Sequence, residues 1–372
     1  MNPVKIGIVG CGNISNQYLK LARQFPILDI VACADLNLEA AKAQAQKHDV
    51  PRACTVEELL ADGEIEIVVN LTIPAAHAPV ALKAIAAGKH VYNEKPLGVT
   101  PDEGRQMLAA AAKQNVRVGC APDTFLGTAH QTCRKLIDDG AIGRPVAATA
   151  FMLCRGHETW HPSPEFYYKP GGGPMFDMGP YYLTALINLL GPIARATGSA
   201  GIQINPRTIT SQPLNGQKIE VETPDHVTGT IDFASGAIGT IITSFATAHS
   251  PHDGKHPITI FGTDGTLQVP DPNNFDGSIL LKTAGDEDYR DVPIEHDHPN
   301  GRSLGVAEMA HGIRENRPHR ASGEVAFAVL SAMQGFLDAA ATGQAQTLDA
   351  GFDRPAMLPL GLEDGVLAEA TV

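Results

Sequence analysis

The first 122 residues alternate short apolar runs with helical patterns, and no other feature constrains the fold as strongly. Strands that alternate with helices at this spacing form βαβ units, in which helices cover both faces of a parallel sheet. The pattern therefore predicts an α/β, doubly wound domain over residues 1–122. The apolar runs lie at residues 4–9, 30–34, 65–71, 90–93 and 117–120, and a helical pattern follows each of the first four.

After residue 122 the pattern changes to strand-like runs that are joined by short turns. Such runs recur between residues 145 and 281. Neighbouring strands joined in this way pair mostly antiparallel. We therefore expect a second, α+β domain over residues 123–345 and a C-terminal tail over residues 346–372. The helices expected in this part lie at residues 127–139, 177–190, 306–315 and 324–342.

The distribution of charge argues against nucleic acid as a partner. The net charge is −13, and residues 1–122 carry 12 basic and 12 acidic side chains, so the remainder of the chain holds the whole acidic excess. A domain charged in this way repels a phosphate backbone. It suits a neutral or cationic small molecule.

Composition and cysteine usage point to a cytoplasmic protein without a membrane partner. The least charged stretch, residues 67–82, is shorter than the ~20 apolar residues that a membrane helix needs. The first residues carry neither the basic nor the apolar region of a signal peptide. The 6 cysteines include no CxxC pair, so we expect reduced thiols and no metal site.

A glycine-rich turn follows the first predicted strand and begins the first helix. The segment Gly10-Cys11-Gly12-Asn13-Ile14-Ser15 matches the pattern G-x-G-x-x-G except that Ser15 replaces the third glycine. The first two glycines permit a tight turn and a close approach of the backbone to a pyrophosphate, and a small serine fits where the third packs helix against strand. A plain turn is the alternative. The residues predicted to bind the cofactor here are Gly10, Gly12, Asn13 and Ile14.

Asp35 ends the second predicted strand, 23 residues after Gly12. A carboxylate at this place accepts hydrogen bonds from both hydroxyls of the adenosine ribose and repels a 2′-phosphate. Leu36 and Asn37 follow, without an arginine that would bind NADP. NAD is therefore the predicted cofactor and NADP is less favoured, while a solvated acid at a strand end is the alternative for Asp35.

Further motifs give the chain a family resemblance. They occur in the order Leu71-Thr72-Ile73-Pro74 with His77, then Glu94-Lys95-Pro96, then Gly171-Gly172-Gly173 followed by Asp177-Met178-Gly179-Pro180-Tyr181. Together with the glycine turn they resemble the Gfo/Idh/MocA family of sugar and polyol oxidoreductases. The resemblance implies a Rossmann domain joined to a domain with a large open sheet, whose face commonly makes oligomer contacts. It thus implies a homodimer or a homotetramer.

The resemblance also implies roles for individual residues. Lys95 would hydrogen-bond the reacting hydroxyl and reach the nicotinamide ribose, with Glu94 supporting it. The family often has a cis peptide bond at the place of Lys95–Pro96. The residues that would line the nicotinamide side of the cofactor are Thr72, Pro74 and His77.

Asp177 and Tyr181 lie four residues apart at the start of a predicted helix, so we expect their side chains to face the same way. Many relatives have His in place of Tyr181, and the branch with Tyr includes members that oxidise aldoses at the anomeric carbon. A tyrosine needs a nearby cation to act as a base at neutral pH, and Lys95 could supply it. We predict that Tyr181 takes the hydroxyl proton and that Lys95 stabilises the alkoxide, while Asp177 orients the substrate or tunes the pair of Lys95 and Tyr181. The alternatives are a buried aromatic anchor for Tyr181 and a surface lysine for Lys95.

The segment His157–His161 spells HExxH, the pattern of zinc proteases. That chemistry needs a helix and a third ligand, whereas Gly156 and Pro162 predict a loop. We instead expect Trp160 and His161 to line a sugar pocket, with loop packing as the alternative. Asp123 is a further candidate for a sugar hydroxyl, with a capping or loop role as the alternative. The segment His296-Asp297-His298 is expected to be a surface loop rather than a metal site.

These observations predict an NAD-dependent dehydrogenase that oxidises a hydroxyl of a sugar, sugar derivative or polyol. Oxidation of an aldose at C1 to a lactone is the first expectation. The alternatives are oxidation of a ring hydroxyl to give a keto-sugar or a keto-inositol, and oxidation of a dihydrodiol. A non-catalytic dinucleotide-binding sensor is the alternative of another class, since the same fold supports one. The intact Glu94-Lys95-Pro96 segment with Asp177 and Tyr181 favours an enzyme.

Overall fold

The computed structural model describes residues 1–362 and 365–367, and these divide into two compact units. Unit 1 comprises residues 1–128, 295–327 and the described residues from 358 onward, and unit 2 comprises residues 129–294 and 328–357. The last residues of the predicted tail, 368–372, lie outside the described residues.

Residues 295–327 fold with unit 1, although the sequence pattern grouped them with the second domain. This segment contains helix α9 (Leu304–Arg314), which packs against strand β6 (Val118–Cys120). Just beyond the helix, Ser322 forms a bridge with Gly119 of the same strand. The chain therefore returns to the edge of the first sheet after completing most of unit 2.

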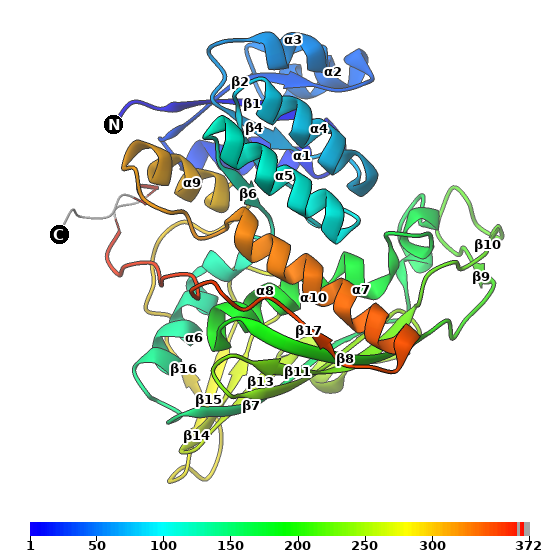
Figure 1. Ribbon diagram of the computed structural model, residues 1–372, viewed down its shortest axis with the longest axis vertical. Coiled ribbons are helices and arrows are strands. Elements are labelled where there is room, and N and C mark those ends of the chain that lie inside the picture. Colours follow the sequence, from blue (N-terminus) through cyan, green and yellow to red (C-terminus); the bar gives the residue numbers. More distant parts are fainter. Residues whose placement is uncertain (363–364, 368–372) are drawn as a thin grey trace. The chain divides into compact units, whose positions relative to one another are not determined.

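Unit 1 contains the predicted doubly wound sheet, in which all strands run parallel in the order β3-β2-β1-β4-β5-β6. Every residue of β4 is buried, as in strands that helices cover on both faces. Figure 1 shows α4 and α5 (cyan) beside this sheet. The elements are β1 (Val4–Val9), α1 (Ser15–Leu21), β2 (Leu28–Ala34), α2 (Leu38–Lys47), β3 (Arg52–Cys54), α3 (Val56–Ala61), β4 (Ile67–Asn70), α4 (Pro74–Ala86), β5 (His90–Asn93), α5 (Pro101–Gln114) and β6.

The pair β3 and α3 is absent from the sequence prediction. Both elements are too short for a hydrophobic period to stand out. A local signal was nevertheless present, because Thr55 and Glu58 form a capping box at the start of α3. The pattern Thr-x-x-Glu before Leu59 and Leu60 would have located this helix.

Unit 2 is built on a large sheet with the strand order β16-β15-β14-β13-β7-β12-β11-β8-β17. Its pairs are antiparallel apart from the parallel pair of β7 and β12, so the expected open, mostly antiparallel sheet is present. Figure 1 shows α8 (Gly179–Leu190) and α10 (Gly323–Thr342) along this sheet. The strands are β7 (Pro145–Leu153), β8 (Ile193–Gly201), β11 (His226–Phe233), β12 (Ile238–Ser244), β13 (Ile258–Gly262), β14 (Gly265–Val269), β15 (Ile279–Thr283), β16 (Arg290–Val292) and β17 (Gln346–Thr347), with a separate hairpin of β9 (Arg207–Thr208) and β10 (Lys218–Ile219).

The helix predicted at residues 177–190 is two helices in the structure. Helix α7 (Gly173–Asp177) ends at Asp177, and helix α8 (Gly179–Leu190) begins two residues later. Pro180 lies in the first turn of α8 and has no N–H group to continue the hydrogen bonds of α7. Asp177 and Tyr181 therefore belong to different helices, which corrects the argument from a single helical face.

Helix α10 (Gly323–Thr342) is the one helix of the described residues that is long and apolar enough to cross a membrane. Within unit 2, however, side chains of this helix are buried in the protein core. Ala332, Phe336 and Ala339 are buried, and the Phe336 ring lies so close to Gly229 of β11 that a Cβ atom there would overlap it. The apolar composition of α10 is thus explained by its packing on the sheet.

Candidate active site

The glycine turn has the backbone that close approach of a pyrophosphate requires. Gly10 has a φ of +99°, and a Cβ atom there would lie 2.7 Å from the Leu71 carbonyl, so only glycine fits. A Cβ atom on Gly12 would meet nothing within 4 Å, which leaves this side of the turn open. Ser15, at the place of the third glycine, is fully buried and its hydroxyl donates to the Gly12 carbonyl at 2.6 Å. The turn therefore fits the dinucleotide that its pattern predicts.

Asp35 lies immediately after β2 and faces the glycine turn. Its Oδ2 atom accepts a hydrogen bond from the Cys11 N–H at 2.8 Å, and its Oδ1 atom accepts one from the Asn37 N–H at 2.8 Å. Each carboxylate oxygen has a second acceptor position, so both retain capacity for a ribose hydroxyl. The two backbone bonds hold the carboxylate beside the glycine turn, whereas a merely solvated strand-end acid would have no such bonds.

The segment after β4 is tied to the segment after β5 by His77. Its Nδ1 atom lies 2.6 Å from the Pro96 carbonyl oxygen, and its Nε2 atom lies 3.0 Å from the Thr72 carbonyl oxygen. The imidazole is completely buried, and this burial lowers the pKa of His77. His77 thus holds the segment of Thr72 and the loop of Lys95 together within unit 1. Ile73, which lies between Thr72 and Pro74, is exposed at the same edge of the sheet.

Lys95 follows β5 and is half-buried. The Glu94 side chain before it accepts the Lys95 N–H at 2.8 Å through Oε2 and the Tyr18 hydroxyl at 2.9 Å through Oε1. The Lys95–Pro96 peptide bond is cis, as the family resemblance implies. The loop at the carboxyl end of β5 is therefore fixed from both sides, on the same edge of the sheet as Gly10 and Asp35.

In unit 2 the predicted catalytic residue Asp177 is paired with His157, to which the sequence analysis assigned no role. The Asp177 Oδ2 atom lies 2.9 Å from Nε2 of His157, and both side chains are mostly buried. Tyr181 is 6 % exposed. His157 belongs to the HExxH segment, whose first three residues form a 3-10 helix rather than the α-helix of a zinc site.

The loop that carries His157 also presents aromatic side chains to solvent. Trp160 is 60 % exposed and Phe166 is 50 % exposed. Rings of Trp160 and Phe166 each lie 5.4 Å from the ring of His161. Trp160 and His161 therefore belong to one aromatic surface, defined here as Trp160, His161, Phe166 and Tyr167.

Asp123 has structural partners inside unit 1. It is completely buried, and its carboxylate accepts hydrogen bonds from the Gly305 N–H at 3.0 Å and from Arg302 at 3.4 Å. Burial raises the pKa of Asp123, which Arg302 and the Gly305 N–H oppose. These bonds tie Asp123 to the start of α9, as in the loop role that the sequence left open.

The expectation of a surface loop at His296-Asp297-His298 is wrong. Both imidazoles are 3 % exposed, and their Nε2 atoms lie 3.0 Å and 2.8 Å from the carbonyl oxygens of Leu358 and Leu126. Each ring is thus a donor to the backbone and not a free ligand. Among the described residues there is no group of three His, Cys, Asp or Glu side chains that could hold a metal ion.

Comparison with known proteins extends the resemblance to both units. Residues 4–121 match the oxidoreductase family with an NAD-binding Rossmann fold, and residues 130–268 match the Gfo/Idh/MocA C-terminal domain. The chain belongs to the Gfo/Idh/MocA family. The family match makes unit 1 an NAD-binding Rossmann domain and the protein an oxidoreductase that acts on CH–OH groups.

Two curated relatives and one solved structure show how far this similarity reaches. The chain is 27% identical over 357 residues to 1,5-anhydro-D-fructose reductase of Ensifer adhaerens, covering 93% of this chain and 98% of that protein. It is 27% identical over 318 residues to trans-1,2-dihydrobenzene-1,2-diol dehydrogenase of Bos taurus, covering 83% and 87%. An NAD-binding oxidoreductase from Klebsiella pneumoniae has the same fold, with a TM-score of 0.81, 23% identity and coverage of 93% and 99%.

Proposed function

We propose that this Gfo/Idh/MocA protein interconverts a secondary hydroxyl of a small cyclic polyol and the corresponding ketone, with NAD as the hydride acceptor. The observation that carries the proposal is the placement of Lys95 at the carboxyl end of β5, on the same edge of the sheet as the NAD-binding turn that follows β1. In open α/β sheets, ligands bind outside this edge. The fixed Glu94-Lys95-Pro96 loop gives a sensor no evident advantage, and so favours the enzyme.

The residues have distinct roles in this proposal. Asp35 and the glycine turn hold the dinucleotide, whose nicotinamide takes the hydride when it is bound. Lys95 stabilises the negative charge that develops on the substrate oxygen. Tyr181 receives the hydroxyl proton, and Asp177 orients the substrate.

The names of the curated relatives favour a ring hydroxyl over the anomeric carbon. One relative is named for 1,5-anhydro-D-fructose and the other for a dihydrobenzene diol. Neither molecule has a free anomeric hydroxyl, so a similar site would act on a ring carbinol. The exposed rings of Trp160 and Phe166 support the same class of substrate, because an aromatic surface packs against the apolar face of a ring. Oxidation of an aldose at C1 becomes the alternative that the experiment must separate.

The open face of the unit 2 sheet supports the proposal of a homo-oligomer. Ala147 of β7 pairs with Ile238 of β12 on one side and with Phe261 of β13 on the other, so the three side chains form one row. Ile238 is 58 % exposed and Phe261 is 37 % exposed. An apolar row on a broad sheet suits burial against a second copy of the chain. Separately, we propose that the protein is located in the cytoplasm.

The test is the absorbance of NADH during incubation of the purified protein with NAD⁺ and a panel of anhydro sugars, methyl glycosides, inositols, dihydrodiols and free aldoses. Turnover of a methyl glycoside or an anhydro sugar is the expected result. Reduction with free aldoses alone would move the chemistry to C1. A preference for NADP⁺ would contradict the role of Asp35, and tight NADH binding without any turnover would favour the sensor.

A further inference from the structure

We propose that His157 is a positioning residue for Asp177, which it holds through a hydrogen bond donated by its Nε2–H group. The inference rests on the proposed function, because it takes Asp177 to orient the substrate. It adds a residue that neither the family motifs of the sequence nor the comparisons assign. His157 and the residues that contact it below belong to unit 2.

The hydrogen bond between the two side chains fixes the position of the proton. The Asp177 Oδ2 atom is 2.9 Å from the His157 Nε2 atom. An ionised carboxylate only accepts hydrogen bonds, so Nε2 must be the donor. The Nδ1 atom is buried and has no hydrogen-bond partner within the part of the chain that the structure describes. A proton on Nδ1 would therefore be left without an acceptor, which favours the Nε2–H tautomer.

The imidazole of His157 is held by rings that close around it. Its centroid lies 4.4 Å from the ring of Tyr167, 4.4 Å from the ring of Phe245 and 5.1 Å from the ring of Trp160. These contacts leave the ring little freedom to rotate away from Asp177. Because Trp160 and Tyr167 belong to the aromatic surface, the pair of His157 and Asp177 adjoins that surface.

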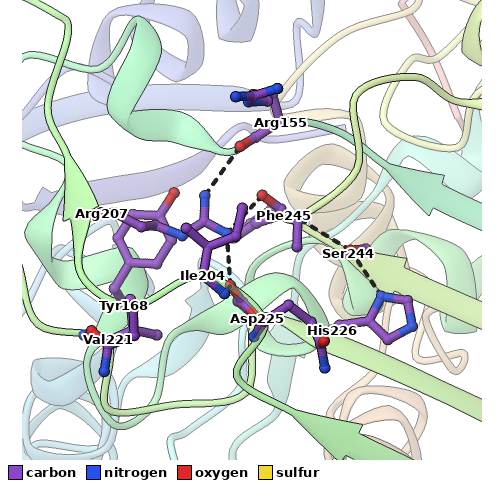
Figure 2. A network of polar contacts seen from close by, with 12 residues as sticks. Arg155, Tyr168, Ile204, Arg207, Val221, Asp225, His226, Ser244 and Phe245 are labelled. Atoms are coloured by element: carbon purple, nitrogen blue, oxygen red, sulfur yellow. Dashed lines mark hydrogen bonds and ion pairs between the residues drawn. The ribbon is translucent and has the colours of Figure 1, made fainter.

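Arg207 fixes the backbone on both sides of His157. The guanidinium is 1 % exposed. It donates to the Arg155 carbonyl at 3.1 Å and to Glu158 Oε1 at 2.8 Å, so the residues before and after Gly156-His157 are bonded to one rigid group. Figure 2 shows Arg207 between Arg155, Tyr168 and Asp225.

Asp225, Phe245 and Tyr168 complete this network. Arg207 donates to Asp225 Oδ2 at 2.7 Å and to the Phe245 carbonyl at 2.8 Å, which anchors it to the large sheet. The Tyr168 hydroxyl donates to Glu158 and accepts the His157 N–H at 3.1 Å. The chain of contacts therefore runs from the sheet through Arg207 and Glu158 to His157 and Asp177.

Gly156 shows that the loop is built around this network. Its φ is +109°, and a Cβ atom there would lie 2.6 Å from the Arg207 Nη1 atom and 2.6 Å from the Tyr168 hydroxyl. Only glycine allows the backbone to pass so close to these groups. A loop that merely covered the sheet would not need a buried charge next to the residue that contacts Asp177.

A spectroscopic experiment tests the tautomer without reference to activity. The full-length protein with bound NADH is labelled with ¹⁵N-histidine, and long-range proton–nitrogen correlations are recorded, with His157→Gln assigning the signal. We expect His157 to show the Nε2–H pattern and this pattern to change in Asp177→Asn. The Nδ1–H pattern, or a His157 signal that does not change in Asp177→Asn, would overturn the inference.

Activity then tests whether the hydrogen bond matters to the reaction. Gln can place an N–H near the position of Nε2, whereas Phe keeps the ring and removes the donor. We expect His157→Phe to lower kcat by about a hundredfold and His157→Gln to recover about a tenth or more of the wild-type value, with NADH affinity unchanged in both. Ser163→Ala, on the exposed part of the same loop, is the matched control.

The two proposals fail in different ways. Equal losses in His157→Phe and His157→Gln, or a loss of NADH binding in both, would contradict the positioning role. A wild-type protein that turns over no member of the panel would contradict the proposed function, and the ¹⁵N spectra would still decide the tautomer and the pairing.

Discussion

The Tyr18 hydroxyl donates a hydrogen bond of 2.9 Å to Glu94 Oε1, although 76 positions separate the two residues. Tyr18 lies on α1, the helix that follows the glycine turn, and Glu94 precedes Lys95. The other oxygen of Glu94 accepts the Lys95 N–H. One buried bond thus connects the helix of the cofactor turn with the loop that carries the predicted catalytic lysine.

Replacing Tyr18 with Phe tests this connection. The Tyr18 side chain is 1 % exposed and Glu94 is 7 % exposed, so the variant leaves Glu94 Oε1 buried without this donor. We expect the free energy of unfolding to fall by about 1–3 kcal/mol, as measured by urea denaturation. Tyr289→Phe, at a tyrosine that is 39 % exposed, should change it by less than about 0.5 kcal/mol. Equal stability of Tyr18→Phe and wild type would show that the bond contributes nothing.

Unit 1 could be predicted from the sequence largely because its signals are local. The run of apolar segments and helices, the glycine turn and the strand-end position of Asp35 all depend on neighbours in the chain. The structure confirms the parallel sheet and shows the Asp35 carboxylate beside the turn. The sequence could not predict that residues 295–327 return to this sheet. The bridge between Ser322 and Gly119 joins two segments that share no sequence pattern.

The partners of Asp177 show why the rest of the site was hidden. His157 and Asp177 lie 20 positions apart on an irregular loop and a short helix, so no periodicity relates them. The HExxH pattern, which the predicted loop excludes as a zinc site, gives no indication of the pairs that the structure shows, His157 with Asp177 and Glu158 with Arg207. The sequence does not predict that Arg207 is buried, because an isolated arginine is expected at the protein surface.

The ion pairs of Arg207 should contribute more to stability than those of an exposed arginine. Substitution by Met removes the positive charge that faces Glu158 and Asp225, which are themselves at most 9 % exposed. Uncompensated buried carboxylates are costly, so we expect Arg207→Met to lower the free energy of unfolding by about 3–5 kcal/mol. Arg195 pairs with Asp232 on the sheet surface, where the arginine is 55 % exposed. Arg195→Met should cost less than about 1 kcal/mol, and similar losses in the two variants would contradict this difference.

The stability of unit 2 should depend on pH through His130. Its side chain is 1 % exposed, and burial lowers its pKa from the ordinary 6.5 to about 4. Between these values the unfolded chain binds a proton that the native protein does not, so stability falls as the pH decreases from 6.5 towards 4. We expect a loss of about 2 kcal/mol between pH 8 and pH 5 from this residue, absent in His130→Gln.

Urea denaturation at both pH values measures this difference. The surface residue His249 provides the control, because His249→Gln should keep the pH dependence of the wild type. A His130→Gln variant that loses as much stability on acidification as the wild type would assign the effect to other groups.

Two glycines at the contact of α10 with the sheet should respond to alanine in opposite directions. A Cβ atom on Gly229 would overlap the Phe336 ring and the Thr197 carbonyl oxygen, so we expect Gly229→Ala to cost about 1–3 kcal/mol. A Cβ atom on Gly335, within α10, would meet its nearest neighbour, the Leu348 side chain, at 3.4 Å. Gly335→Ala should therefore stabilise the protein by about 0.5–1 kcal/mol through helix propensity. Thermal denaturation of the two variants decides the sign, and a stabilised Gly229→Ala would contradict the packing of Phe336 on β11.

Lys95 has two predicted roles, at the reacting hydroxyl and at the nicotinamide ribose, and these roles affect different quantities, kcat and the affinity for NADH. Lys95→Met keeps the length of the side chain and removes the charge that would stabilise the substrate oxygen. We expect kcat to fall by about 10²–10⁴-fold, the range for loss of one such group, while NADH affinity, followed by fluorescence titration, changes by less than about threefold. Lys83→Met, at an exposed lysine of α4, is the charge-matched control and should keep both values. If Lys95→Met instead weakened NADH binding and left kcat near the wild-type value, the lysine would be a cofactor ligand alone, and the proton and charge chemistry would have to come from Tyr181 and Asp177.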